Sequence, residues 1–120
     1  MDAKNLQKFL SGEVANLYEL SKFLRPDLSR ESDHKTYLEI AEFMKVKPKE
    51  AFDYMMFLSD IGCLETGLVR DTDVPTKYSG GGAFFRGFTL AKSYMLELEI
   101  MKRITFSKAV GKSLNQYTDK

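Results

Sequence analysis

Hydrophobic residues recur at helical spacing through the first quarter of the chain. They are separated by three, four or seven residues and so share one helical face; the members are Leu6, Leu10, Val14, Leu17 and Leu24. Gly12 lies within this face and costs about 1 kcal/mol relative to alanine in a helix. Residues 1–25 are therefore predicted to form an N-terminal helical region, either as one helix or as two helices with a joint.

Two shorter amphipathic segments follow a polar loop at residues 29–35. Ser32 or Asp33 can cap the first segment, and its apolar stripe consists of Tyr37, Leu38, Ile40, Ala41 and Met44. A connector at residues 45–47 leads to Pro48, which suits the first turn of a helix because its missing N–H would have no partner there. Gly62 is predicted to end this second helix in a left-handed conformation. The inward face of the second helix is formed by Ala51, Met55 and Leu58.

The pattern becomes compatible with β-structure after Gly62. Residues 63–70 and 83–88 are predicted to form two strands of a hairpin, and the long loop between them contains Pro75 and three consecutive glycines at 80–82. Thr89 can cap a final helix that continues less regularly to residue 114. The predicted fold class is therefore mainly α with a small β-hairpin, an α+β fold.

Short motifs in the central helices resemble those of a known family. The run Glu39-Ile40-Ala41 is followed by a turn, a second helix, and an exit in which Leu58 precedes Gly62 and an apolar pair. This order resembles the winged helix-turn-helix of prokaryotic transcription regulators of the MarR, ArsR and PadR types. The resemblance implies a single winged-helix domain over residues 1–120 with extra helices at both ends. Its parts would be the N-terminal helical region (1–25), a helix-turn-helix (36–62), a wing hairpin (63–88) and a C-terminal helix (89–114).

The resemblance implies a regulator that binds duplex DNA. The second helix of such a motif places its early turns in the major groove, and the wing contacts the backbone. The residues at matching positions are Lys47, Lys49 and Tyr54 in the helix, and Arg70, Lys77 and Arg86 in the wing. Solvated lysines at a helix start and a soluble loop would explain the same residues without DNA. Asp53 would be repelled by phosphate, which weighs against the helix as a DNA-contacting element.

Further apolar residues on the second helix suggest an alternative. Phe52, Met56 and Phe57 are not needed for its inward face, and exposed apolar clusters tend to mark protein interfaces. A winged-helix module that docks another protein through them is thus an alternative function. The competing interpretation is that they pack beneath the terminal helices or the wing.

Apolar residues of the last helix suggest self-association. Leu98, Met101 and Ile104 are predicted to form a homodimer contact, because winged-helix regulators commonly dimerise through their terminal helices. The alternative is that this helix covers the core of its own domain.

Composition narrows the class of protein. The chain has 120 residues, enough for one domain, and its net charge of +1 argues against a wholly basic nucleic-acid coat protein. Cys63 is the only cysteine and the N-terminus has no apolar signal region, which together favour a protein of the reducing cytoplasm. No apolar run is long enough to span a membrane.

The sequence offers little for catalysis or metal binding. His34 is the only histidine, so no cluster with metal-ligand spacing exists, and Cys63 is expected to be a buried structural thiol. No enzyme activity, metal or cofactor is predicted. A ligand pocket lined by Tyr18, Phe23 and Tyr94 stays open as a second interpretation beside simple core packing.

Overall fold

The chain folds into five helices and a three-stranded antiparallel sheet within the residues that the structure describes. The computed structural model describes residues 3–29, 33–70, 84–91 and 95–109, the last four by their backbone only. The elements in chain order are α1 (Ala3–Leu10), α2 (Leu17–Phe23), β1 (Lys35–Thr36), α3 (Tyr37–Met44), α4 (Pro48–Asp60), β2 (Leu64–Arg70), β3 (Phe84–Leu90) and α5 (Leu96–Ala109). This α+β class agrees with the prediction. No helix among these residues is long and apolar enough to cross a bilayer.

The N-terminal region consists of two helices. Gly12 adopts a φ of +84°, a left-handed conformation that ends α1 and that a residue with a side chain would adopt only with strain. Asn16 then begins α2, because its side-chain oxygen accepts a hydrogen bond from the backbone N–H of Glu19 at 3.0 Å. Of the two alternatives left by the sequence, the jointed pair is correct.

The start of α3 differs from the prediction. Its N-cap is Thr36, not Ser32 or Asp33: Glu39 N donates to Thr36 Oγ1 at 3.2 Å, and Thr36 N donates to Glu39 Oε2 at 2.9 Å. This reciprocal capping box satisfies two backbone donors at once. The residues just before α3 extend as β1 instead of continuing the predicted loop.

A three-residue turn joins α3 to α4. Lys45 closes α3 in a left-handed conformation with a φ of 59°, and Val46 N donates back to the carbonyl of Ala41 at 3.0 Å. Lys47 is the N-cap of α4 and Pro48 fills its first position, as expected. Gly62, with a φ of +83°, lies just beyond the C-cap of α4, which confirms the predicted stop.

The sheet has the strand order β1-β3-β2, so the strand that precedes α3 pairs with the last strand. In the hairpin of β2 and β3, Leu64 pairs with Leu90 and Arg70 with Phe84, which confirms the predicted hairpin. Its second strand runs two residues further than expected, to Leu90. Thr89 is therefore not a helix cap: it is buried in β3, and its hydroxyl donates to the carbonyl of Leu24 at 3.1 Å.

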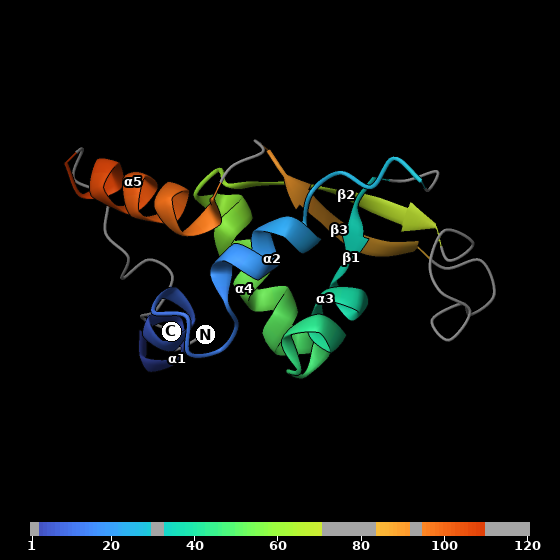
Figure 1. Cartoon of the computed structure of the whole chain (residues 1–120), viewed down its shortest axis with the longest axis horizontal. Coiled ribbons are helices and arrows are strands. Elements are labelled where there is room, and N and C mark those ends of the chain that lie inside the picture. The colour runs from blue at the N-terminus through green and yellow to red at the C-terminus, as the bar shows by residue number, and fades with distance from the viewer. Residues whose placement is uncertain (1–2, 30–32, 71–83, 92–94, 110–120) are drawn as a thin grey trace.

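The last helix consequently starts later than expected. The strand keeps residues 89–90 in the sheet, and α5 begins at Leu96. The expected end at residue 114 lies outside the described residues. Figure 1 shows α5 and the β2–β3 hairpin toward opposite ends of the molecule, with α2, α3 and α4 between them.

The core lies where α4 meets the sheet and the other helices. Side chains from every helix and from β3 contribute to it, and its largest fully buried members include Phe9, Leu20, Ile40, Met55, Phe57, Leu58, Phe88, Leu96 and Ile100. Burial of such side chains contributes about 1.5–3 kcal/mol each. One core therefore holds all the described elements together.

A polar contact fixes the loop that connects α2 to β1. Asp27 accepts hydrogen bonds from Lys35 Nζ at 2.8 Å and from Ser29 N at 3.0 Å. These bonds from Lys35 and Ser29 hold the pKa of the Asp27 carboxyl well below its usual range. The loop is thereby tied to the first strand of the sheet.

Candidate nucleic-acid interface

The N-terminal turn of α4 exposes two of the predicted DNA-contacting residues. Lys47 and Lys49 are both exposed, since they occupy the N-cap and the second position of the helix. Lys49 Nζ lies 3.4 Å from a carboxylate oxygen of Asp53, one helical turn later. The helix N-terminus carries a partial positive charge that adds to that of the lysines, whereas Asp53 offsets part of it.

Tyr54 does not belong to this exposed turn, so its prediction as a DNA contact is wrong. Its side chain is only 4% exposed, and its ring stacks on that of Phe9 with 4.5 Å between centroids and 11° between planes. The reason is helical geometry: position 54 follows Ala51 by three residues and precedes Leu58 by four, so it faces the core with them. The spacing of the inward face could have revealed this.

The apolar residues of α4 are also occupied within the chain. Phe57 is fully buried, so its prediction as part of a partner interface is wrong. Phe52 and Met56 are half-buried and pack against the core. Phe52 lies edge-on to Tyr37 at 5.6 Å and to Phe88 at 6.4 Å between ring centroids. Core packing explains much of the apolar surface of these residues, and only Phe52 and Met56 stay partly exposed for the docking face of the alternative function.

The β2–β3 hairpin exposes the two described arginines of the predicted wing. Arg86 pairs with Leu68 across the strands, and its Nη1 donates to Thr66 Oγ1 at 3.3 Å. The guanidinium of Arg70 lies 5.9 Å from the centre of the ring of Phe84, its pairing partner. Both arginines are exposed. Lys77, the third predicted wing residue, lies outside the described residues.

One aromatic contact relates α4 to this hairpin. Residues two apart on a strand share a face, as do residues paired across two strands. Arg70 and Arg86 therefore lie on the same face of the hairpin as Phe88. Because Phe88 packs on Phe52 of α4, this face and the helix adjoin one another. The contact thus joins the inner end of this face to α4, and the arginines lie further out along the same face.

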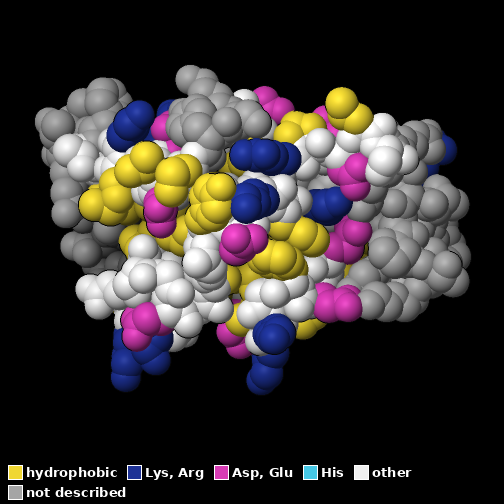
Figure 2. Space-filling model, viewed as in Figure 1, with side chains coloured by type: hydrophobic (Ala, Val, Ile, Leu, Met, Phe, Trp, Pro, Cys, Tyr) yellow, Lys and Arg dark blue, Asp and Glu magenta, His cyan; other side chains and the backbone are white. Residues whose placement is uncertain are grey.

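The charge on α4 is nearly balanced. From its N-cap to its last residue it carries two lysines, Lys47 and Lys49, and three carboxylates, Glu50, Asp53 and Asp60, which sum to −1. Lys and Arg side chains are likewise interspersed with Asp and Glu on the face shown in Figure 2. Any attraction for phosphate must therefore come from local groups and not from a broad basic surface.

The described part of α5 presents two of the three predicted dimer residues. Leu98 is 54% and Met101 60% exposed, and they are three residues apart on the helix. Hydrophobic side chains gather over the α5 end of the molecule in Figure 2. Ile104 is buried in the core of its own chain, so its prediction as a dimer contact is wrong. The inner side of α5 covers the core, and its outer side stays exposed.

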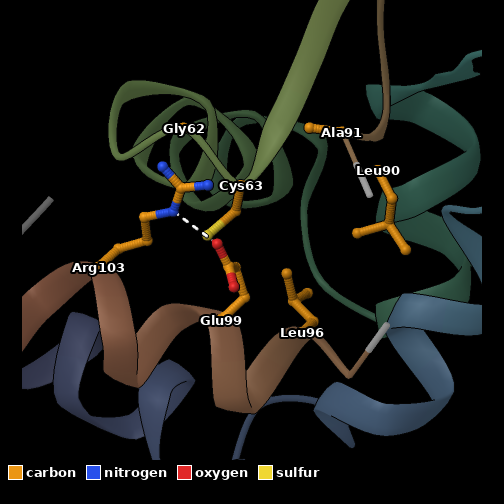
Figure 3. Close-up of a pocket in the computed structure, with 7 residues that line it drawn as sticks. All are labelled: Gly62, Cys63, Leu90, Ala91, Leu96, Glu99 and Arg103. Atoms are coloured by element: carbon orange, nitrogen blue, oxygen red, sulfur yellow. Dashed lines mark hydrogen bonds and ion pairs between the residues drawn. The ribbon is translucent and has the colours of Figure 1, made fainter. Parts of the chain in front are cut away.

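A small cleft lies where α5 meets the junction of α4 and β2 (Figure 3). Its cavity volume is about 10 Å³, enough for roughly one water molecule. Arg103 Nε lies 2.6 Å from Glu99 Oε1, and the guanidinium of Arg103 packs against Gly62. The cleft is too small for a ligand; the ion pair lies within α5, and the packing of Arg103 on Gly62 brings this helix against the residues that follow α4.

Cys63 borders this cleft and is buried, as expected. Burial, together with the negative charge of Glu99, raises the pKa of the Cys63 thiol from 9.0 to about 12, although Arg103 acts in the opposite direction. A thiol in this state is a poor nucleophile. The described residues also contain no group of three or more His, Cys, Asp or Glu side chains that could hold a metal ion.

The aromatic residues considered for a ligand pocket do not meet in the described structure. The ring of Phe23 stacks on Phe43 at 4.4 Å, and Tyr18 is exposed beside Lys22. Tyr94 lies outside the described residues.

No family model matches the chain, and no curated protein or solved structure has significant similarity to it. Inference about function therefore depends on the geometry of the chain itself.

Proposed function

We propose that this protein is a winged helix-turn-helix transcription regulator that binds duplex DNA as a homodimer. The observation that supports the fold is the order of elements around α4. A three-residue turn joins α3 to α4, a hairpin follows, and a strand from before α3 completes the sheet in the order β1-β3-β2. This arrangement is typical of a winged helix, in which the second helix of the pair is the reading element.

In this proposal the N-terminal turn of α4 enters the major groove. Lys47 and Lys49 contact phosphate or guanine there, because they are the exposed cations of that turn. Tyr54 takes no part. Lys49 is shared between DNA and Asp53, so the helix contributes less attraction than its two lysines would alone.

The hairpin supplies the remaining contacts. Arg70 and Arg86 bind the DNA backbone beside the groove that α4 occupies, and Lys77 adds a third cation from the same segment of the sequence. Backbone contacts of this kind position a protein on DNA without reading base identity.

Dimerisation is supported by the exposed side of α5. Leu98 and Met101 are large apolar side chains that a second copy of the chain would remove from water. A two-fold dimer would place its two α4 helices about 34 Å apart, one turn of DNA, on a palindromic site.

The decisive experiment measures duplex binding as a function of salt. Fluorescence anisotropy with a mixed-sequence duplex compares the wild type with the double variant Arg70→Gln/Arg86→Gln. Losing two phosphate contacts per chain is expected to flatten the slope of log K against log salt by about 1.8 per chain. Lys4→Gln/Lys8→Gln is the matched control, because it removes the same charge from exposed positions on α1, far from the hairpin in Figure 1.

Two results would count against the proposal. Absence of duplex binding by the wild type at low salt would reject DNA binding altogether. An equal change of slope in the hairpin variant and in the α1 control would show that net charge, and not the hairpin, is responsible for binding.

A further inference from the structure

Two large apolar side chains are exposed on the β2–β3 hairpin. Leu68 is 64% and Phe84 56% exposed, although both belong to regular strands. Arg70 and Phe84 form the outermost pair of the described ladder, and Leu68 is two pairs further in. These side chains therefore project from the outer part of the hairpin, away from the core.

The apolar side chains and the arginines alternate on one face. Leu68 is paired with Arg86, and Arg70 with Phe84, so the two apolar residues are diagonal neighbours and so are the two arginines. The other described residues of this face are Leu64, Thr66, Phe88 and Leu90, and none of the eight is acidic. Among its described residues, the hairpin face thus combines exposed apolar area with two arginines and no carboxylate.

This combination fits a nucleic acid better than a second copy of the chain. Two-fold pairing of this face with itself would bring arginines close to arginines, with no described carboxylate on the face to neutralise them. Duplex DNA offers phosphates to the arginines and, between its base pairs, an apolar space for the other two side chains. Proteins that bind the minor groove often insert apolar wedges of this kind beside cationic side chains.

We propose that the hairpin inserts Leu68 and Phe84 as a wedge between base pairs in the minor groove, while Arg70 and Arg86 hold the flanking phosphates. The inference rests on the proposed function, because it assumes duplex binding. The contact between Phe52 and Phe88 holds the inner end of this hairpin face against α4. With α4 in the major groove, the proposal assigns the wedge at the outer end to an adjacent minor groove.

A wedge has two measurable consequences. Partial unstacking kinks the duplex, so the protein bends DNA. Base steps that unstack easily, such as TA or a mismatch, are bound more tightly than stiff A-tracts because they are easier to deform.

The test uses a duplex of about 30 base pairs labelled at both ends, with either a central TA step, a central mismatch or an A-tract. Energy transfer between the ends reports bending, and anisotropy reports affinity. The wild type is expected to bend the TA duplex and to bind the mismatched duplex about tenfold more tightly than the A-tract. A tenfold ratio corresponds to about 1.4 kcal/mol.

Leu68→Ser/Phe84→Ser is expected to lose both the bend and the mismatch preference. Its salt slope should stay unchanged, because all charges are retained. Leu28→Ser is the matched control, since Leu28 is an exposed leucine that lies outside the strands, in the loop between α2 and β1. Phe84→Leu keeps an apolar side chain and should retain most of the bend, which separates the wedge from general damage to the hairpin. Circular dichroism and thermal melting check that each variant is folded.

The outcomes separate the wedge from the proposed function. Duplex binding without bending, or bending unchanged in the double variant, would overturn the wedge and leave DNA binding intact. Stronger, Phe84-dependent binding to a single strand than to any duplex would overturn it in favour of base stacking on an open strand. Failure of the wild type to bind any duplex would reject both proposals.

Discussion

Replacing Asp53 by asparagine is expected to strengthen DNA binding. The Asp53 carboxylate lies 3.4 Å from Lys49 Nζ on the exposed side of α4. Under the proposed function it both repels phosphate and engages a cation that would otherwise contact DNA. Asn is nearly the same size and uncharged, so Asp53→Asn removes both effects while the shape of the helix is preserved.

The size of the effect follows from the geometry. A carboxylate roughly 8 Å from a phosphate in water contributes about 0.5 kcal/mol of repulsion, which corresponds to about a twofold change in Kd. Release of Lys49 to a phosphate adds one contact and steepens the salt slope by about 0.9 per chain. The lost ion pair costs the helix only about 0.3 kcal/mol, since the Lys49 side chain is 86% exposed.

Asp60→Asn is the matched control. Asp60 is the last residue of α4, seven positions and therefore about 10 Å beyond Asp53 along the axis, close to one Debye length at 0.1 M salt. Anisotropy titrations at several salt concentrations should show tighter binding and a steeper slope for Asp53→Asn than for Asp60→Asn. Equal behaviour of the two variants, or weaker binding of Asp53→Asn, would refute the placement of α4 against DNA.

Three further predictions concern the rest of the molecule. Because the pKa of Cys63 is raised from 9.0 to about 12, its thiolate fraction at pH 8 is about a thousandfold lower than in the unfolded chain. Thiol labelling should therefore be slow until denaturant is added. The free energy of unfolding should fall as pH rises from 9.0 toward 12, because the unfolded chain loses the thiol proton first. Because the pKa of Asp27 is lowered in the folded protein, its carboxylate stabilises the fold at pH values above its usual pKa of 3.8. Asp27→Asn should therefore lower the melting temperature at pH 7, and the gap between wild type and variant should shrink as pH falls below 3.8. Leu98→Glu/Met101→Glu should shift the chain from dimer to monomer in sedimentation and weaken duplex binding, whereas Leu28→Glu should leave the dimer intact.

Features determined by local chemistry were predictable from the sequence. Pro48 and Gly62 mark the two ends of α4 because each suits a particular backbone conformation at a helix terminus. Gly12 similarly divides the N-terminal region. The hairpin was predictable from two β-compatible runs separated by a glycine-rich loop. At the helix ends the signal and the structure lie within a few residues of one another, and the two strands of the hairpin are consecutive elements of the sheet.

Features determined by distant contacts were not predictable in the same way. Residues 35–36 form β1 only because β3, about fifty positions later, offers pairing partners. Thr89 resembles a helix cap in its local sequence, but its hydroxyl donates a hydrogen bond to the carbonyl of Leu24 and its backbone stays in the sheet. The exposure of Leu68 and Phe84 on the hairpin was not predictable, because alternation in a strand does not reveal which face stays exposed.

The distribution of charge and apolar surface bears on how such a protein would select its sites. A nearly neutral α4 with two lysines at its start provides few groups that form the bidentate contacts by which arginine, asparagine or glutamine distinguish bases. Under the two proposals the hairpin, with Arg70 and Arg86 around Leu68 and Phe84, would instead respond to the charge and deformability of DNA. Selection from a random duplex library should then enrich flexible pyrimidine–purine steps repeated about one helical turn apart, with weak base preference under α4. Enrichment of a fixed base motif without such steps would instead assign the reading of sequence to α4, and the hairpin would be a backbone contact alone.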